Sequence, residues 1–248
     1  MGSAPQAMQM DQRVYPDIDS LSRAAMDELV AVMRAAIAQR GRFALALSGG
    51  HTPAKMYSLW ATEEKYRGRT SWDRVHLFWS DERYVPSDDP LSNYRMTKEA
   101  LLSRAPIPAA NVHPVPTGIA PPEKAAAEYD AELHRFFGSA APEFDLQLLG
   151  LGVEGHTASL FPGSPVLEEQ KEWVAAVVAP IEPPQRLTFT PAVLNCGRNT
   201  FFLVSGPNKR EIVAALRAEP TNRPSQYPAG RIRPSGRVIW FLDQAAAT

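Results

Sequence analysis

The sequence contains very little cysteine and no long apolar run. Cys196 is the only cysteine in the 248 residues, so an internal disulfide framework is excluded. This usage is typical of a reducing compartment, and we expect the protein to be cytoplasmic. No run of about 18 apolar residues occurs, which argues against a membrane-spanning helix. The N-terminal residues lack a basic segment followed by an apolar one, so no secretory leader is expected.

An excess of either charge is also missing. Lysine and arginine total 26 and aspartate and glutamate total 27, which gives a formal net charge of −1. The basic residues form no long patch, so we expect neither nucleic acid nor a membrane surface as the partner. The metal-binding motifs HExxH and CxxC are absent, and the five histidines are scattered along the chain. The residues therefore give no reason to expect a metal site.

Apolar residues make up 44% of the chain and alternate between helical spacing and short continuous runs. Helices are predicted at 20–39, 52–60, 91–104, 123–137 and 207–218. Strands are predicted at 43–47, 75–79, 144–151, 173–179, 200–205 and 237–242. We expect Ser20 and Thr52 to be N-caps and Gly41 to end the first helix. The strands are almost continuously apolar, which predicts an α/β, three-layer Rossmann-like fold with a mostly parallel sheet and helices on both faces.

Three polar segments follow predicted strands, at 48–52, 80–83 and 150–159. In an open parallel sheet, ligands bind outside the carboxyl ends of the strands. Because these segments stand at strand ends, we expect them to meet at one crevice. This crevice is the predicted functional site.

Ser48, Gly49 and Gly50 join a strand to a helix. Glycines allow close backbone approach, and the free N–H groups of a helix start attract anions, so this turn suits a phosphate group. The spacing matches neither the P-loop nor the dinucleotide motif GxGxxG, so a dinucleotide is not expected. The alternative is a glycine turn without a ligand.

Three cationic side chains stand where they could complete an anion site. Arg83 leaves a strand end, Arg186 follows two prolines, and Lys209 lies in the first turn of its predicted helix. A lysine there is unfavourable for the helix dipole unless an anion is near. The alternative for each is a solvated surface charge.

His156 lies on a glycine-rich bend, two residues after Glu154. A histidine with an ordinary pKa of about 6.5 is mostly a free base at neutral pH and can take a proton from water. Glu154 could orient the imidazole by accepting from its other nitrogen. Thr157 and Ser159 are alternative nucleophiles, but the nucleophile-elbow pattern GxSxG is absent.

Asp81 and Glu82 form an acidic pair after a predicted strand. They could bind substrate hydroxyls or transfer protons. The alternative is that they pair with a nearby arginine or cap the following loop. Asn93 could likewise cap a helix or reach the crevice.

The segments "LSGGHTP", "WSDERYVPSDDPLSNY", "LLGLGVEGHTASLFPGSP" and "RLTFTPAVLN" occur in this order. Together they resemble the 6-phosphogluconolactonases, within the family that also contains glucosamine-6-phosphate deaminases, over about residues 20–243. The resemblance implies hydrolysis of 6-phospho-D-glucono-1,5-lactone to 6-phosphogluconate in the oxidative pentose phosphate pathway. It also implies a site without metal or cofactor. Residues 16–248 would form a single α/β lactonase domain behind a flexible terminus of residues 1–15.

The resemblance also implies roles for particular residues. His156 matches the family's catalytic histidine, and Glu154 stands where the family usually has aspartate. The phosphate site corresponds to Ser48, Gly49, Gly50, Arg83, Arg186 and Lys209, and Asp81 would support the site. Phe161 stands where the deaminases of the family carry a glutamate for ring opening, which favours the lactonase. The remaining alternatives are an amino-sugar phosphate deaminase or isomerase and a non-catalytic sugar-phosphate sensor. We expect a monomer that acts on a small sugar phosphate lactone.

Overall fold

A computed structural model describes residues 11–138, 141–219 and 224–248. Its centre is a six-stranded sheet in the order β1-β9-β8-β5-β2-β3, with every neighbouring pair parallel. The six strands are β1 (Asp11–Tyr15), β2 (Phe43–Leu47), β3 (Val75–Trp79), β5 (Leu146–Leu149), β8 (Asn199–Val204) and β9 (Arg237–Asp243). This confirms the predicted α/β fold with a mostly parallel sheet.

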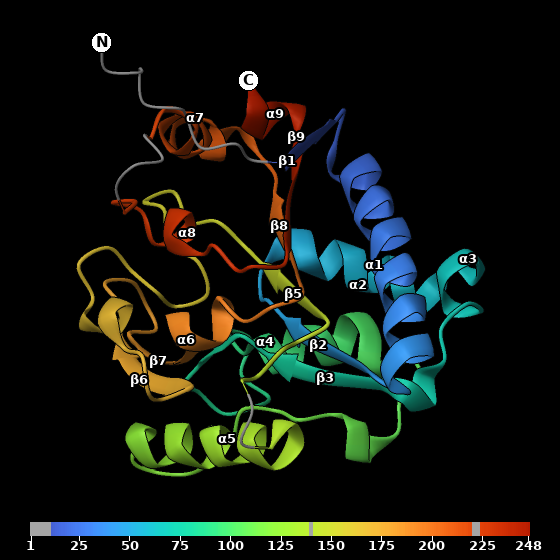
Figure 1. The fold of residues 1–248 in the computed structure, drawn as a ribbon, viewed down its shortest axis with the longest axis horizontal. Helices are drawn as coiled ribbons and strands as arrows, with labels where there is room; N and C mark the ends of the chain where they lie inside the picture. The colour runs from blue at the N-terminus through green and yellow to red at the C-terminus, as the bar shows by residue number, and fades with distance from the viewer. Residues whose placement is uncertain (1–10, 139–140, 220–223) are drawn as a thin grey trace.

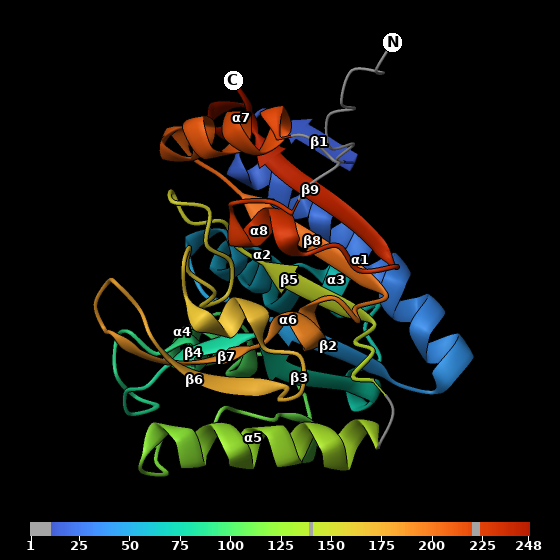
Figure 2. The ribbon, with the colours of Figure 1, turned by 60° about the vertical axis from the view of Figure 1, so that its left-hand side comes forward.

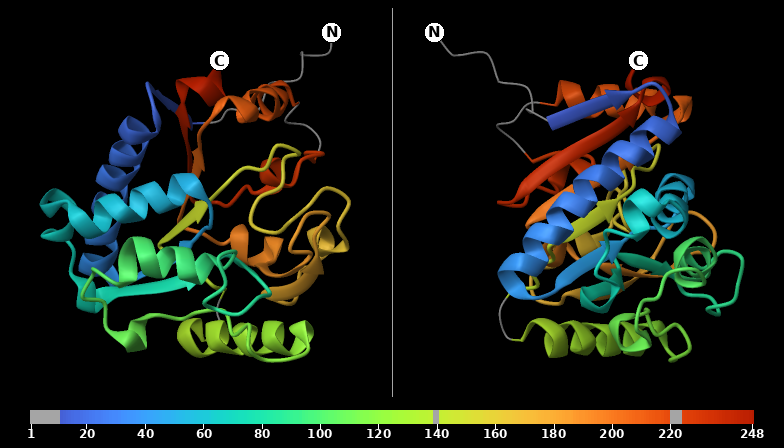
Figure 3. Two further views of the ribbon diagram at one scale, coloured as in Figure 1. Left: turned by 180° about the vertical axis from the view of Figure 1, so that it is seen from behind. Right: turned by 90° about the vertical axis from the view of Figure 1, so that its right-hand side faces the viewer.

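Helices and a second sheet cover the parallel sheet from its two sides. The α-helices are α1 (Ile18–Arg40), α2 (His51–Thr62), α3 (Glu64–Arg67), α4 (Asn93–Thr97), α5 (Pro122–Phe137), α6 (Pro191–Leu194), α7 (Arg210–Ala218), α8 (Pro228–Arg231) and α9 (Gln244–Ala247). Figures 1 and 2 show α1 and α2 on one side, with α6, α8 and the second sheet on the other. In Figure 3, on the right, α1 crosses the face of the parallel sheet.

The second sheet is a three-stranded antiparallel one that the sequence analysis did not predict. It contains β4 (Asp81–Arg83), β7 (Gln185–Phe189) and β6 (Val174–Val178), in the order β4-β7-β6. Residues 173–179 are therefore a strand as predicted, but in this sheet. α5 packs against β6 and β7 (Figure 2). Because alternate residues of a strand face opposite sides, Asp81 and Arg83 share one face of β4 and Glu82 has the other.

Two predicted N-caps are wrong. Helix α1 begins earlier than expected, because Asp17 caps it and accepts a hydrogen bond from the Ser20 N–H at 2.7 Å. Helix α2 begins at His51 behind Gly50, whose φ of 104° a residue with a side chain rarely adopts. Thr52 lies inside α2, and its hydroxyl is 2.7 Å from that of Ser205. The predicted stop at Gly41 is confirmed, since its φ is 73°.

Other boundaries differ in detail. Residues 11–15, predicted to be part of a flexible terminus, form β1 beside β9, while residues 1–10 lie outside the described residues. The helix predicted at 91–104 is the short α4 followed by a π-helical turn, Lys98–Leu102. The helix predicted at 207–218 begins with a 3₁₀ turn, Pro207–Lys209, before α7.

The registers of the parallel strands bring their carboxyl ends together. Leu47 at the end of β2 lies beside Trp79 at the end of β3, and Leu149 at the end of β5 lies beside Phe202. The chain moves from β2 to β3 on one side, while β5 lies on the other side of β2. Such a switch point is where parallel sheets bind ligands.

Among the described residues, none of the helices has the length and apolar character of a membrane span.

A substitution at Leu148 tests the central position of β5, because the Leu148 side chain is completely buried. We expect Leu148→Ala to lower the free energy of unfolding by about 2–5 kcal/mol, the range for leucines in a packed core. The control is Val178→Ala, since Val178 is 77% exposed, and its effect should stay within about 0.5 kcal/mol. Denaturant unfolding measures both, and equal small effects would contradict the buried position.

Candidate active site

A cavity of about 180 Å³ opens at the carboxyl ends of the parallel strands. Of the residues that the family resemblance assigns to the site, all except Glu154 line it. Its lining consists of Ser48, Gly49, Gly50, Asp81, Arg83, Asn93, Gly150, Leu151, Gly152, His156, Thr157, Ala158, Arg186 and Lys209. The three polar segments that the sequence placed at strand ends therefore meet in one pocket.

The Tyr57 side chain fixes the Ser-Gly-Gly turn through hydrogen bonds to the Ser48 backbone. The buried Tyr57 hydroxyl donates to the Ser48 carbonyl at 2.9 Å and accepts from the Ser48 N–H at 3.1 Å. Gly49 leaves room for a neighbour, because a Cβ there would lie 1.9 Å from the Asn93 Oδ1 atom. At Gly50 no side chain caps α2, so its first N–H groups remain available to an anion.

The three predicted cations line the same pocket without an ion pair. Arg83 and Arg186 are direct cross-strand partners in the antiparallel β4–β7 pair. Arg83 donates to the Leu91 carbonyl at 2.9 Å and to Asn93 Oδ1 at 2.5 Å, while its buried Nε has no partner. Arg186 is 4% exposed and donates to the Pro183 carbonyl at 3.0 Å. Within the described residues, neither arginine nor Lys209 pairs with a carboxylate.

Burial acts on the charges of these side chains. Desolvation lowers the pKa of Arg186, and a nearby Asp81 only partly offsets it. Desolvation likewise lowers the pKa of Lys209, against the attraction of Glu154. In both cases burial acts against the charged form of the side chain. An anion bound among them would replace the water that they have lost.

His156 and Glu154 lie close together on the loop after β5. The Glu154 Oε1 atom is 3.0 Å from His156 Nδ1, although the angle falls outside hydrogen-bond geometry. Gly152 makes this arrangement possible, because a Cβ there would lie 2.0 Å from His156 Nδ1 and 2.7 Å from Glu154 Oε2. The loop closes on itself through the Gly152 N–H, which donates to the His156 carbonyl at 2.8 Å.

The surroundings of the imidazole favour its neutral form. It is largely buried and packs on the Phe161 ring, with 4.4 Å between centroids. Burial lowers the pKa of His156 below its ordinary value, and the Glu154 carboxylate opposes this shift. A neutral ring can accept a proton from a water molecule in the pocket.

Asp81 and Glu82 have different surroundings, as their opposite faces require. Asp81 is in the pocket, and its Oδ2 accepts from the Ser159 hydroxyl at 2.8 Å. Ser159 is completely buried, so it supports Asp81 and is no nucleophile for a ligand in the pocket. Glu82 is 2% exposed and accepts from the N–H groups of Asn93 and Tyr94. The capping alternative therefore holds for Glu82.

Several lining residues have no individual role in the sequence prediction, although Gly152 and Ala158 belong to the predicted segment 150–159. Gly152 lines the pocket beside the imidazole, and the glycine-rich sequence around His156 is the signal that indicates such a close backbone approach. Ala158 has a φ of 47°, a backbone conformation that side chains disfavour and that often marks functional sites. For Asn93 the sequence allows either a helix cap or a position in the crevice, and the structure places it in the crevice.

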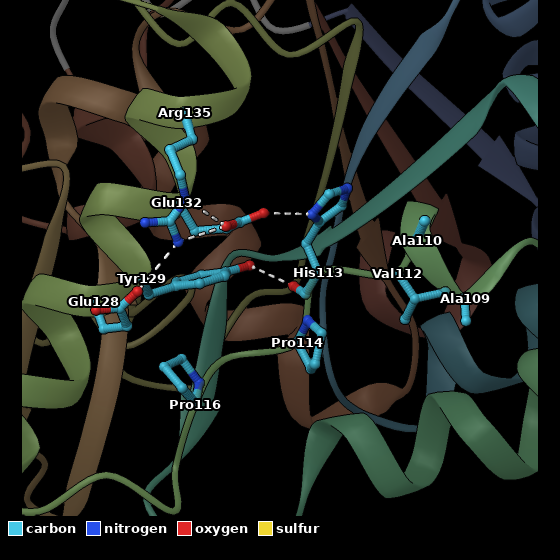
Figure 4. Close-up of a pocket in the computed structure, with 10 residues that line it drawn as sticks. All are labelled: Ala109, Ala110, Val112, His113, Pro114, Pro116, Glu128, Tyr129, Glu132 and Arg135. Atoms are coloured by element: carbon cyan, nitrogen blue, oxygen red, sulfur yellow. Dashed lines mark hydrogen bonds and ion pairs between the residues drawn. The ribbon is translucent and has the colours of Figure 1, made fainter.

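A second pocket of about 360 Å³ lies between α5 and residues 109–116 and shares no lining residue with the first. Figure 4 shows Glu132 between His113 and Arg135, with contacts of 2.7 Å to each. Arg135 also pairs with Glu128 at 3.1 Å. Because these charges are already paired, the second pocket lacks the free cations of the first. Within the described residues, no cluster of histidine, cysteine and acidic side chains is arranged to hold a metal ion.

Gly152→Ala tests how the imidazole is placed. We expect the added Cβ to push His156 toward solvent, so that its pKa rises toward the ordinary value of about 6.5. The measurement is an NMR pH titration of the His156 ring resonance in both proteins. Gly118→Ala is the matched control, because nothing lies within 4 Å of a Cβ there. An unchanged His156 pKa in a folded Gly152→Ala protein would contradict the crowding.

The chain matches the family described as glucosamine-6-phosphate isomerases/6-phosphogluconolactonase over residues 16–240. It is 46% identical to a 6-phosphogluconolactonase of Synechocystis over 85% of this chain and 86% of the relative. It is 40% identical to a 6-phosphogluconolactonase of Nostoc, covering 96% and 98%. The solved 6-phosphogluconolactonase from Trypanosoma cruzi superposes with a TM-score of 0.85 at 29% identity, covering 99% and 98%. The chain therefore belongs to the glucosamine-6-phosphate isomerase/6-phosphogluconolactonase family.

Proposed function

We propose that the protein hydrolyses 6-phospho-D-glucono-1,5-lactone to 6-phospho-D-gluconate, a step of the oxidative pentose phosphate pathway. The observation that carries this proposal is one pocket lined by both the His156 imidazole and three cations that form no ion pair with any described carboxylate. Its relatives from Synechocystis and Nostoc are named as 6-phosphogluconolactonases, which supports the same activity.

The cations are assigned to the phosphate of the substrate. Arg83 and Arg186 are cross-strand neighbours of like charge, an arrangement that costs stability unless an anion lies between them. Lys209 and the Ser-Gly-Gly turn add an ammonium group and backbone N–H groups to the same pocket. A phosphate dianion matches this set of donors. Its binding fixes the sugar ring and lowers the entropic part of the barrier.

His156 is assigned as the general base. With its proton on Nδ1, toward Glu154, its Nε2 atom is basic and removes a proton from water as the oxygen attacks C1 of the lactone. The bond between C1 and the ring oxygen then breaks, and the imidazolium returns the proton to that oxygen. The products are a carboxylic acid and a hydroxyl group, so one water molecule is consumed.

The oxyanion that forms at C1 is assigned to backbone N–H groups of the loop after β5. The Gly152 N–H already donates to the His156 carbonyl, so we assign the oxyanion to other pocket-lining residues of this loop, among them Leu151 and Ala158. The disfavoured φ of Ala158 is consistent with a backbone held for such a contact. Donors of this kind contribute roughly 3–4 kcal/mol to transition-state stabilisation in other enzymes.

Deamination of an amino-sugar phosphate is the weaker alternative. Phe161 packs on the imidazole where the family's deaminases carry a glutamate for ring opening. Among the described lining residues, Asp81 is the one carboxylate. Lactone hydrolysis needs no second acid, whereas ring opening and loss of the amine do. Ammonia release from glucosamine 6-phosphate would favour this alternative.

We further propose a monomer in the cytoplasm, with one domain that begins at or before residue 11, because residues 11–15 form β1 of the parallel sheet. The described residues of this chain include both the imidazole and the cations that the proposed chemistry uses. One continuous core joins the elements on both sides of the parallel sheet. The lone cysteine and the nearly balanced charge fit a cytoplasmic protein that acts on a small molecule rather than on nucleic acid.

His156→Ala separates an enzyme from a sensor. We expect kcat to fall by about 100-fold or more with little change in KM, because general-base catalysis is lost while phosphate binding remains. Acid release from freshly generated lactone is measured against a protein-free sample, which corrects for spontaneous hydrolysis. His134→Ala is the control, since His134 is half-exposed and lies outside the pocket. Equal rates for the parent and His156→Ala would contradict the assignment of His156 as general base. A parent protein that hydrolyses the lactone no faster than buffer would favour the non-catalytic sugar-phosphate sensor.

The pH dependence of kcat/KM follows from the burial of His156. The base must be neutral, so activity falls as the pH drops through its pKa. Because burial lowers that pKa, the midpoint of the acid limb should lie below 6.5. Glu154→Gln removes the charge that raises the pKa, so the limb should move to still lower pH. A midpoint above 6.5, or a move to higher pH in Glu154→Gln, would contradict this assignment.

A further inference from the structure

Glu82 is a buried carboxylate just outside the proposed site. It lies in β4 between the pocket residues Asp81 and Arg83, but on the opposite face, and it is 2% exposed. Its Oε1 accepts from the backbone N–H groups of Arg83 at 2.8 Å and Asn93 at 2.7 Å. Its Oε2 accepts from the Tyr94 N–H at 2.7 Å and the Ser92 hydroxyl at 3.1 Å. All four partners are donors.

These bonds attach the start of α4 to β4. Ser92 and Asn93 begin α4, and Arg83 ends β4, so one carboxylate joins the two elements beside the pocket. The N–H groups of a helix start need acceptors, and a carboxylate there also suits the helix dipole. The position of Asn93 therefore depends on Glu82.

The side chain of Asn93 connects the start of α4 to the pocket. Its amide nitrogen donates to the Asp81 carbonyl at 2.9 Å, and its Oδ1 accepts from Arg83 at 2.5 Å. The same side chain fills the space that the missing Cβ of Gly49 leaves. The Leu91 carbonyl, just before α4, holds the same Arg83 nitrogen at 2.9 Å. The start of α4 thus fixes the guanidinium group that we assign to phosphate.

We propose that Glu82 is a positioning residue for phosphate binding, acting through Asn93 and Arg83. This inference rests on the proposed function of the pocket. Glu82 touches no ligand, so its effect is on where the Arg83 guanidinium lies. A shift of about 1 Å in a binding group is enough to change the kinetics strongly.

Glu82→Gln is the test substitution because it keeps the size of the side chain. One acceptor oxygen becomes an NH₂ group, which cannot accept from a backbone N–H group, so in either orientation of the amide at least one of the three backbone donors loses its partner. With 6-phosphogluconolactone, we expect KM to rise about 10-fold while kcat changes by less than about threefold, as for the loss of uniform binding. With glucono-1,5-lactone, which has no phosphate, kcat/KM should stay within about threefold of the parent value.

The double variant Glu82→Gln/Arg83→Ala tests whether Glu82 acts on phosphate binding through Arg83. If Glu82 acts through Arg83, its effect on KM should largely disappear once Arg83 is alanine, because residues in one network are not additive. Fully additive effects would overturn the proposal. So would equal losses of kcat/KM with the phosphorylated and the unphosphorylated lactone.

Asp145→Asn is the matched control. Asp145 is also a buried carboxylate, 3% exposed, and accepts from the Ala44 N–H at 2.8 Å and from Arg40. It lies at the other end of β2 and β5, away from the pocket. Its substitution should lower stability without selecting between the two lactones. If Asp145→Asn shows the same KM pattern as Glu82→Gln, a general loss of stability explains both and the inference fails.

Two further measurements keep the test decisive. If Glu82→Gln does not fold, Ser92→Ala removes one donor to Glu82 together with the N-cap acceptor of the Arg95 N–H, and it should raise KM in the same direction by a smaller factor. Titration calorimetry with 6-phosphogluconate measures binding without turnover. A parent that binds it but does not hydrolyse the lactone would refute the proposed function alone. Unchanged affinity in folded Glu82→Gln would refute the inference alone.

Discussion

The pocket depends on positive charge that the described residues compensate only in part. Arg83 and Arg186 face each other across β4 and β7, and Lys209 lines the same cavity, against the single lining carboxylate Asp81. Carbonyl oxygens and an amide hold the arginines, but these partners bring no full negative charge. Repulsion of this kind persists only where the remaining fold stabilises it. The observation points to an anionic ligand more strongly than any single cation does.

Much of the site could be predicted because residues after parallel strands must share an edge of the sheet. Ser48, Asp81 and Gly150 follow strands whose apolar runs are plain in the sequence, so their convergence was expected. Motif resemblance then assigned Arg186 and Lys209, which the strand pattern alone does not place. The structure confirms that both line the same pocket.

What the sequence did not predict depends on contacts between distant segments. The short strand β4 is only three residues long and polar, and its pairing with β7 shows no local signal. That pairing decides that Asp81 and Arg83 face the pocket while Glu82 faces α4. The N-caps were missed for a related reason: Ser20 and Thr52 are good caps by type, but Asp17 and Gly50 reach the helix starts first. Local preference does not choose between neighbouring candidates.

The glutamate at 154, where the family usually has aspartate, is accommodated by the bend itself. Its longer side chain brings Oε1 to 3.0 Å from His156 Nδ1, and its Oε2 occupies space that a Cβ at Gly152 would take. The angle between carboxylate and ring is poor for a hydrogen bond, so the influence of Glu154 on His156 is mainly that of a nearby negative charge. Orientation of the imidazole then comes chiefly from packing, by Phe161 on one side and the Gly152 backbone on the other. The same bend that gives the histidine its place also makes the longer acid tolerable.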